Sequence, residues 1–378
     1  MINQQRLADE FARLAAINSP PLRERAISVY LADRLQSLGG KVFFDDAAEK
    51  TGGEVGNLVA RFSANGRNCE PLLFSVHMDT VEPDGQVVPK LEDGVFTSAG
   101  ETILGADDKA GIAEVIEMLE VLREQAIPHG EIEVVVTIAE EIGLVGAKNF
   151  DYNLVNSRRG YALDTPEINW MVLKAPGANR MKVEILGREA HAGVAPEQGV
   201  SAIQTAGLAL ANMRLGRIDH ETTANFGRIE GGVACNIIPL RVFLEGEARS
   251  HDADKLQSQT EHLVACFVEA ADAMAREIDG QLVRPEITVE IQPDYPRMAV
   301  DEEAGVVALA RRASEAAGHD LKIRIGGGGS DANMFNAHGI EMIILATGMQ
   351  NVHTVAENVS VADMAHVTEL LLEIVKQA

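Results

Sequence analysis

The feature that most limits the fold of this chain is a series of short apolar runs separated by longer segments of helical periodicity. The runs include PLLFSVHMD, EIEVVVTIAEE, RGYALDT, NWMVLKAPG and GIEMIILATG. They are apolar over most of their length, as strands buried on both faces are. Between them, one segment is apolar at intervals of three and four, at Ile112, Val115, Ile116, Leu119 and Leu122. This spacing predicts a helix with one buried face. The alternation predicts an α/β fold with a mostly parallel sheet between two layers of helices.

The two ends of the chain extend the same pattern. Helical periodicity at about 2–17 and about 21–38 precedes the strand candidates KVFFDD and GNLVARF, and a closing helix is expected at about 361–376. These segments belong with the larger domain, which we place at residues 1–178 and 292–378.

The middle of the chain, residues 179–291, follows a different order. Strand NRMKVEILG is followed by a helix at about 198–214, by strands ANFGRIEGG and IPLRVFLEGEARS, by a helix at about 253–278 and by strand EITVEIQPD. The β-α-β-β-α-β order is typical of a ferredoxin-like, two-layer domain. We therefore expect this segment to be a small α+β domain inserted into the larger one.

Composition excludes several classes of partner. The chain has 378 residues, 46% of them apolar, with 57 acidic against 33 basic side chains and a formal charge of -24. This charge repels nucleic acid and anionic membranes. No apolar run reaches the roughly 18 residues of a membrane span, and the cysteines Cys69, Cys235 and Cys266 are few and odd in number. A reducing, cytoplasmic location is expected.

Residues of the types that bind metals follow the predicted strands, where each strand ends. In an open α/β sheet, ligands bind beyond the carboxyl ends of the strands. The candidates are His77 and Asp79 after LLFSV, Asp107 in GADDKAG, Glu140 and Glu141 after VVVTIA, Asp164 after GYAL, and His353 after MIILATG. Each alone has a structural explanation, such as an acid that complements a helix dipole. Together, at successive strand ends, they favour a metal site.

Two histidines with several carboxylates are the ligand types of a dinuclear zinc site, in which one carboxylate can bridge the ions. Two such ions can activate a water and stabilise both oxygens of a tetrahedral intermediate. A hydrolase also needs a carboxylate that does not bind metal and can take the proton of this water. The adjacent pair Glu140 and Glu141 can divide these two tasks.

The motifs SVHMDTV, GADDKAG, TIAEEIGLVGA, LDT and VHTVAENV occur in the order found in a known family. The chain resembles, over nearly its whole length, the dinuclear zinc peptidases that include peptidase T, carboxypeptidase G and the aminoacylases. It looks most similar to the peptidase T branch. The resemblance implies a three-layer α/β/α catalytic domain and an inserted ferredoxin-like lid and dimerisation domain.

The resemblance also implies roles for the strand-end residues. One metal would be bound by His77, Asp107 and Asp164, and the other by Asp107, Glu141 and His353, with Asp107 as the bridge. The implied cofactor is a pair of divalent ions, Zn²⁺ first, with Mn²⁺ or Co²⁺ as alternatives. Glu140 would be the general base toward a metal-bound water, Asp79 would orient the imidazole of His77, and Asp108 would cap the helix.

An aspartate at position 164 resembles the aminopeptidases of the family, whereas relatives with glutamate tend to be carboxypeptidases or deacylases. This favours a tripeptidase-like exopeptidase that releases the N-terminal residue of a short peptide. The alternative is a deacylase or carboxypeptidase acting on N-acyl amino acids.

The inserted segment carries candidates of its own. His191 in GREAHAGVAPEQG resembles a histidine that polarises the scissile carbonyl in relatives, often from the partner subunit of a homodimer. Asn236 and Arg249 resemble substrate-binding positions, and an arginine can clamp a carboxylate through two bonds. Two alternatives remain open, because Asn236 can cap a turn and Arg249 can form a surface ion pair.

The glycine run IGGGGSD is expected to bring the backbone N–H groups of Gly328, Gly329 and Ser330 close to a substrate carboxylate. The chain departs from peptidase T here. Where that enzyme has an arginine directly before its GGTD motif, this sequence has Gly327, and the nearest arginine is Arg324.

Two other classes of function are less consistent with the sequence. A nucleotide-binding protein would need a GxxxxGK[ST] element, or GxGxxG between an early strand and a helix, and neither occurs. A non-catalytic relative would be expected to lack a ligand or the base, yet every one of these residues is present.

Overall fold

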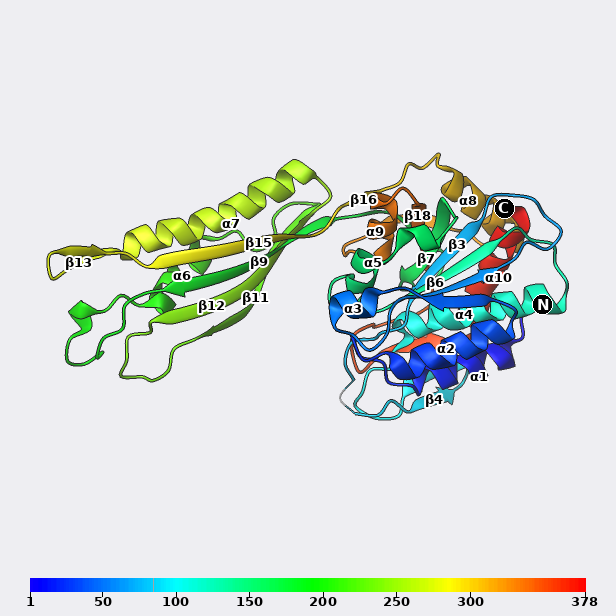
Figure 1. Cartoon of the computed structure of the whole chain (residues 1–378), viewed down its shortest axis with the longest axis horizontal. Coiled ribbons are helices and arrows are strands. Elements are labelled where there is room, and N and C mark those ends of the chain that lie inside the picture. Colours follow the sequence, from blue (N-terminus) through cyan, green and yellow to red (C-terminus); the bar gives the residue numbers. More distant parts are fainter. Residues whose placement is uncertain (84) are drawn as a thin grey trace. The chain divides into compact units, whose positions relative to one another are not determined.

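The computed structural model describes residues 1–83 and 85–378. The chain divides into two compact units, one formed by Met1–Ala175 with Met298–Ala378 and the other by Pro176–Arg297. Figure 1 shows both units, with the second coloured green to yellow. Each unit is built around its own sheet and its own hydrophobic core.

The first unit is built on a mixed sheet whose centre is parallel. Its spatial order is β1 (Lys41–Phe44), β2 (Leu58–Phe62), β6 (Ile132–Thr137), β3 (Leu72–His77), β7 (Arg159–Thr165), β18 (Glu341–Ala346), β8 (Trp170–Ala175) and β16 (Met298–Ala299), with β17 (Lys322–Ile325) also on β8. The central strands β6, β3, β7 and β18 run parallel. Their carboxyl ends therefore meet at one edge of the sheet.

Every residue of β3 and β6 is buried, which confirms the interpretation of their apolar runs as strands covered on both faces. Helix α4 (Ala106–Glu124) packs on β3 and β7, whereas α9 (Asp331–Ala337) packs on β7 and β18. The two helices lie on opposite sides of these strands (Figure 1). The predicted helix-covered, mostly parallel sheet is thus confirmed.

The remaining helices of this unit complete the two outer layers. They are α1 (Gln4–Ala15), α2 (Arg25–Ser37), α3 (Ala47–Thr51), α5 (Val145–Asn149), the short 3-10 helix η1 (Tyr152–Leu154), α8 (Gly305–Ala317) and α10 (Val361–Gln377). Helix α4 packs against both α1 and α10. It is buried on every side from Ala106 to Leu122, so the prediction of a single buried face was wrong.

Ion pairs explain how two of the buried glutamates of α4 are accommodated. Glu117 pairs with Arg6 of α1 at 2.6 Å, and Glu120 pairs with Arg34 of α2 at 2.9 Å. Arg34 also binds Glu10 of α1 at 2.9 Å. These ion pairs join α1, α2 and α4 into one layer.

A small sheet lies apart from the main one in the same unit. It consists of β4 (Pro89–Glu92), β5 (Val95–Ser98) and β19 (Asn358–Ser360), and β19 connects directly to α10. The small sheet and helix α8 were absent from the expectations based on sequence. Strand β19 follows immediately after residues 353–357, which include His353 of the predicted site.

The second unit has a sheet with the order β10 (Gly216–Arg217), β11 (Thr222–Gly231), β12 (Arg241–Ser250), β9 (Gly177–Leu186) and β15 (Glu286–Tyr295). Helices α6 (Ala202–Asn212) and α7 (Ala253–Met274) pack on one face, where Val183, Leu244 and Phe267 belong to the core. The order of the four long strands matches the predicted ferredoxin-like arrangement.

Two boundaries in this unit differ from the prediction. The second helix ends at Met274, and Arg276–Ile278 instead forms strand β13, which pairs with β14 (Gln281–Val283). The first helix begins at Ala202, after a short 3-10 turn η2 (Pro196–Gln198), because Ser201 caps it by accepting the N–H of Gln204. Within the described residues, no helix is both long and apolar enough to cross a membrane.

Candidate metallopeptidase active site

The predicted strand-end residues of the first unit gather where the parallel strands end. His77 is the last residue of β3, Asp164 lies near the end of β7, and Glu140 and Glu141 follow β6. Asp107 lies in the first turn of α4, and His353 lies in the loop after β18. Parallel pairing of β3 with β6 and β7 places these ends side by side.

Asp107 lies at the centre of this group. Its Oδ1 is 3.1 Å from Nε2 of His77, and its Oδ2 is 3.3 Å from Nε2 of His353. Nε2 of His353 is also 3.0 Å from Oε1 of Glu141. Ligand atoms of His77, Asp107 and Glu141 all lie within 4.8 Å of one another. The two oxygens of one carboxylate thus face two different imidazoles.

The charges of this group depend strongly on one another. Burial alone would lower the pKa of His77, but hydrogen bonds to Asp107 and Asp79 hold it well above the usual value. Hydrogen bonds to Asp107 and Glu141 raise the pKa of His353 to about 10, against the effect of burial. Burial acts to raise the pKa of Asp107, yet the bonds to His353 and His77 lower it. The group therefore favours Asp107 as a carboxylate.

Two further carboxyls show the opposite behaviour. Burial raises the pKa of Asp164 to about 8, and the charge of Asp107 adds to this shift. Burial, followed by the charge of Asp164, raises the pKa of Glu140 well above its usual value. Several acids in one buried place therefore favour any cation that could bind between them.

Two buried acids fix the backbone that carries the glutamate pair. The carboxylate of Asp79 accepts the N–H of Glu140 at 2.9 Å and that of Glu141 at 3.1 Å. Glu24, which lies just before α2, accepts the N–H of Ala139 at 3.0 Å. His77 Nδ1 is 2.9 Å from the backbone oxygen of Asp79 and 3.6 Å from its carboxylate. The side chain of Asp79 therefore holds the Glu140–Glu141 turn as well as facing His77.

A third buried acid, Glu357, holds the turn that carries Asp107. Its oxygens accept the N–H groups of Leu104, Gly105 and Asp107. Sequence reasoning missed both Glu24 and Glu357. The only signal for Glu357 was its place in the motif VHTVAENV, four residues after His353.

Asp108 does not cap α4, as the sequence had suggested. The helix begins after Gly105, and the backbone of Asp107 and Asp108 is not helical. Asp108 is instead fully buried, and its Oδ2 accepts the N–H of His77 at 3.2 Å. Its carboxylate therefore supports the end of β3.

Asp331, the first residue of α9, is another buried acid near the site. The hydroxyl of Thr137 donates a hydrogen bond to its Oδ2, and Oδ1 has no partner within the described part of the chain. Burial raises the pKa of Asp331 to about 6. This acid directly follows the glycine run, but nothing in the sequence distinguished it from a helix N-terminal acid.

The candidates in the second unit lie on neighbouring segments. His191 forms a β-bridge with Ile237, and the backbone oxygen of Asn236 accepts the N–H of Ala192 at 2.9 Å. Arg249, on β12, is paired with Glu247 at 2.9 Å. His191 and Asn236 are thus brought together, whereas Arg249 forms the ion pair that the sequence had left as its alternative.

The glycine run forms the loop between β17 and α9. The N–H of Ser330 donates to Oδ1 of Asn333 at 3.2 Å, so this group is used within the loop, whereas Gly328 is exposed and Gly329 is partly exposed. Arg324 lies over the ring of Trp170 at 4.3 Å and binds both oxygens of Glu167 at 3.1 Å. It is therefore engaged by its own neighbours.

The donor set suits a pair of divalent ions. Imidazole nitrogens and carboxylate oxygens are common ligands of Zn²⁺. The two oxygens of Asp107 turned toward His77 and His353 form the arrangement that a bridging carboxylate requires. The fold and this donor set define a metal-dependent hydrolase of the α/β class with an inserted ferredoxin-like unit.

Comparison with known proteins gives the family. Residues 73–377 match the peptidase family M20/M25/M40, and the chain belongs to this family. It is similar to the aminopeptidase PepT of Bacillus cereus, with 41% identity, a TM-score of 0.87 and coverage of 100% of this chain and 99% of that one. It is also similar to a tripeptidase of Staphylococcus aureus, with 37% identity, a TM-score of 0.92 and coverage of 100% and 98%.

A curated relative, the uncharacterized protein YqjE of Bacillus subtilis, is 38% identical over 379 residues and is covered completely, as is this chain. The predicted family and its PepT-like branch are thereby confirmed. The matches favour an exopeptidase of short peptides over a deacylase of N-acyl amino acids. The chain is a metallopeptidase of the aminopeptidase type.

Proposed function

We propose that this protein releases the N-terminal residue of short peptides with the help of two divalent metal ions, and that Glu140 is its general base. The observation that carries the proposal is the position of Asp107, whose two carboxylate oxygens face the imidazoles of His77 and His353 separately. The PepT and tripeptidase neighbours support the choice of substrate.

The ligand set of the proposal divides around Asp107. His77, Asp107 and Asp164 would hold one ion, and Asp107, Glu141 and His353 the other, with Zn²⁺ as the first choice and Mn²⁺ or Co²⁺ as alternatives. When bound, the two ions would lower the pKa of a water molecule and stabilise negative charge on the substrate oxygen.

Glu140 is the residue left free to move a proton. It takes the proton of the attacking water and then delivers it to the leaving amine. The N–H groups of Glu140 and Glu141 are bound to the two oxygens of one carboxylate, that of Asp79. This arrangement holds the base at a fixed place beside the ligand Glu141, which is the division of labour inferred from the sequence.

The second unit supplies the remaining roles of the proposal. We assign residues 179–291 to a lid and dimerisation domain, and residues 1–178 with 292–378 to the catalytic domain. His191 would polarise the scissile carbonyl, and Asn236, on an adjacent segment, would bind the substrate. Arg249 would bind the substrate only after leaving Glu247, and the exposed loop at Gly328 and Gly329 would receive the peptide carboxylate.

The edge of the second sheet supports a homodimer. Strand β10 covers only Thr223 and Ala224 of β11, and in the described residues the segment from Arg228 to Gly231 pairs with β12 alone. An unpaired edge can join the same edge of a second copy around a twofold axis. We therefore place the dimer contact at this strand.

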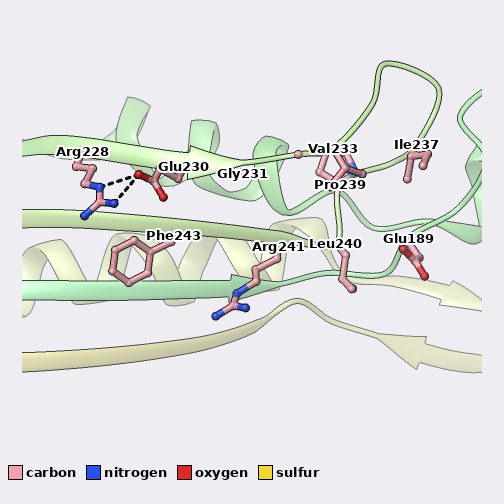
Figure 2. A pocket seen from close by; sticks show the side chains of 11 residues that line it. Glu189, Arg228, Glu230, Gly231, Val233, Ile237, Pro239, Leu240, Arg241 and Phe243 are labelled. Atoms are coloured by element: carbon pink, nitrogen blue, oxygen red, sulfur yellow. Dashed lines mark hydrogen bonds and ion pairs between the residues drawn. The ribbon is translucent and has the colours of Figure 1, made fainter.

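A cavity of about 580 Å³ lies beside this edge (Figure 2). Its lining includes Phe243 and Leu240, together with Arg228 and Glu230, which are bonded to each other. Val233 in the lining is 84% exposed, and Ile229 of the same edge strand is 55% exposed. This combination of apolar area with both signs of charge suits a second copy of the chain.

The dimer can be tested by light scattering during size-exclusion chromatography. An Ile229→Asp variant should shift the protein from dimer to monomer, because a buried unpaired carboxylate opposes association. The matched control is Ile291→Asp on β15, the opposite edge strand, where the side chain is 43% exposed. A dimer that survives Ile229→Asp would place the contact elsewhere.

The protein is proposed to act in the cytoplasm on small peptides, without nucleic acid or membrane partners. The three cysteines are all free thiols, as a reducing compartment permits. The formal charge of -24 opposes binding to phosphate backbones and anionic lipid.

The main experiment compares three substrates after metal removal and restoration. They are a tripeptide with a free amine, its N-acetylated form and its C-terminally amidated form. The proposal expects cleavage of the free-amine peptides at the first bond, loss of activity in chelator, and recovery with Zn²⁺, Mn²⁺ or Co²⁺. Cleavage of the acetylated peptide alone would replace this function with a deacylase.

Matched variants at the glutamate pair separate chemistry from metal binding. Glu140→Gln should retain two ions but lose turnover by roughly 10²- to 10⁴-fold, the usual contribution of a general base. Glu141→Gln should instead lose metal, measured by elemental analysis of the dialysed protein. Near-normal turnover in Glu140→Gln would end the assignment of the base.

A further inference from the structure

Glu357 occupies an unusual position in the chain. It lies four residues beyond His353, in the segment that leads from β18 to β19, and it is only 1% exposed. The sequence separation between Glu357 and the turn at Leu104–Asp107 is about 250 residues. A single buried side chain therefore joins two distant segments that each carry a proposed metal ligand.

Glu357 accepts its hydrogen bonds from backbone N–H groups, and its charge also acts on the buried ammonium of Lys109. Its Oε2 accepts the N–H of Leu104 at 2.8 Å and that of Gly105 at 2.8 Å, and its Oε1 accepts the N–H of Asp107 at 3.1 Å. Hydrogen bonds from N–H groups to a carboxylate are stronger than bonds between neutral groups. Both oxygens are used, and three N–H donors of one turn are satisfied by one residue.

The turn depends on these bonds because its own backbone cannot satisfy them. Gly105 has a left-handed backbone with φ of 74°, and Asp107 has non-helical angles of -83° and 105°. N–H groups at the start of a helix have no partner within the helix. Buried N–H groups without partners cost about 1 to 3 kcal/mol each, so the turn is held in this shape by the side chain that binds them.

We propose that Glu357 is a positioning residue that fixes the bridging carboxylate Asp107 relative to His353, so that one side chain governs the binding of both metal ions. The inference rests on the proposed dinuclear site. It makes Glu357 the residue on which the binding of both ions depends. Replacing an ordinary ligand such as Glu141 would lower the affinity chiefly for the ion that it binds. Glu357 touches no ligand atom, yet it acts on the residue that both ions share.

The test measures metal affinity directly and does not depend on activity. Affinity for each of two Co²⁺ or Zn²⁺ ions would be obtained by competition with a chromophoric chelator, using full-length wild-type protein, Glu357→Gln and Glu141→Gln. In Glu357→Gln, the amide nitrogen would face at least one N–H of the turn, donor against donor. We expect affinity for both ions to fall roughly 10- to 100-fold, as for other outer partners of metal ligands.

The matched control is Glu101→Gln, which removes one charge from an exposed position in the same segment as the turn. It should bind both ions as the wild type does. A residue with a merely structural role would lower the melting temperature of the metal-free protein and leave both affinities unchanged. That result, or the loss of one ion only, would overturn the inference.

A second variant covers the case in which Glu357→Gln does not fold. Glu357→Asp keeps the charge but shortens the side chain by one methylene, and it should weaken both ions by a smaller factor than the amide. Unchanged affinities in Glu357→Asp would then overturn the proposal. Failure of the wild-type protein to bind two ions would contradict the dinuclear function itself, so the two failures are distinguishable.

Discussion

Replacing Glu24 by glutamine should stabilise the metal-free protein at alkaline pH and have little effect at acidic pH. Glu24 is fully buried and accepts the N–H groups of Leu22 and Ala139 through Oε1 alone. Its Oε2 has no partner among the described residues. Burial raises the pKa of Glu24 from 4.5 to about 7, and the charge of Asp79 adds to the shift. A glutamine can keep Oε1 and both bonds without carrying the charge.

Because the pKa of Glu24 is raised in the folded protein, this side chain lowers the stability of the fold at high pH. Between about pH 4.5 and 7 the folded protein holds a proton that the unfolded chain releases, so stability falls as pH rises through this window. A gap of about 2.5 units corresponds to about 3 kcal/mol of lost stability above pH 7. The Glu24→Gln variant has no such loss, because its side chain does not titrate.

Calorimetry of the chelator-treated protein at about pH 5 and about pH 8 measures the effect. The melting temperature of Glu24→Gln minus that of the wild type should increase by several degrees between the two conditions, at roughly 2 to 4 °C per kcal/mol. Glu49→Gln, an exposed position, controls for the loss of one negative charge. A difference that does not change with pH would refute the reasoning.

Two further predictions concern the ion pairs between α1, α2 and α4 and the close packing behind the glutamate pair. Arg34→Ala should destabilise the protein by about 3 kcal/mol, because buried Glu10 loses its cation and keeps only the hydroxyl of Tyr30, whereas Glu120 keeps its ion pair with Arg123, and chemical denaturation would measure this loss. Gly146→Ala should destabilise by about 1 to 3 kcal/mol and reduce turnover, because its new Cβ would lie 2.2 Å from the backbone oxygen of Ile138, just before the glutamate pair. Melting curves and peptide hydrolysis by the same preparation test this second variant, and an unchanged melting temperature would contradict it.

The strands of the central sheet could be predicted because a strand that is buried on both faces consists of nearly continuous apolar residues. Short apolar runs such as those of β3 and β6 are typical of strands that are covered on both faces. The small elements have no such apolar run in the sequence. Strands β4 and β10, for example, are short and largely exposed, so their residues follow no apolar pattern. Tertiary contacts decide whether such segments pair.

The candidate site was predictable to the extent that its residues lie at strand ends. His77, Asp107, Glu141 and His353 come together as their positions along the chain suggested. The acids that hold their backbone could not be identified in this way. The role of Glu24 exists only through a contact with a residue 115 positions away, and no local pattern specifies such a contact.

Asp108 shows how local reasoning can fail beside a correct motif. An acid in the first turn of a helix normally complements the helix dipole. Here the backbone of Asp107 and Asp108 departs from helical angles, and the carboxylate of Asp108 turns to the N–H of His77. The sequence shows that an acid is present at position 108, but only the folded structure determines which N–H group it binds.

The three-residue contact of Glu357 also bears on how the protein is made. During synthesis the turn at Leu104–Asp107 emerges long before residues 353–357, which belong to the same compact unit, and compact units generally fold as wholes. Until these residues emerge, the Asp107 turn lacks the partner of three N–H groups. Capture of the proposed metal pair must therefore wait until almost the entire chain has left the ribosome. A truncated product that ends before residue 353 should fold in part but remain free of bound metal.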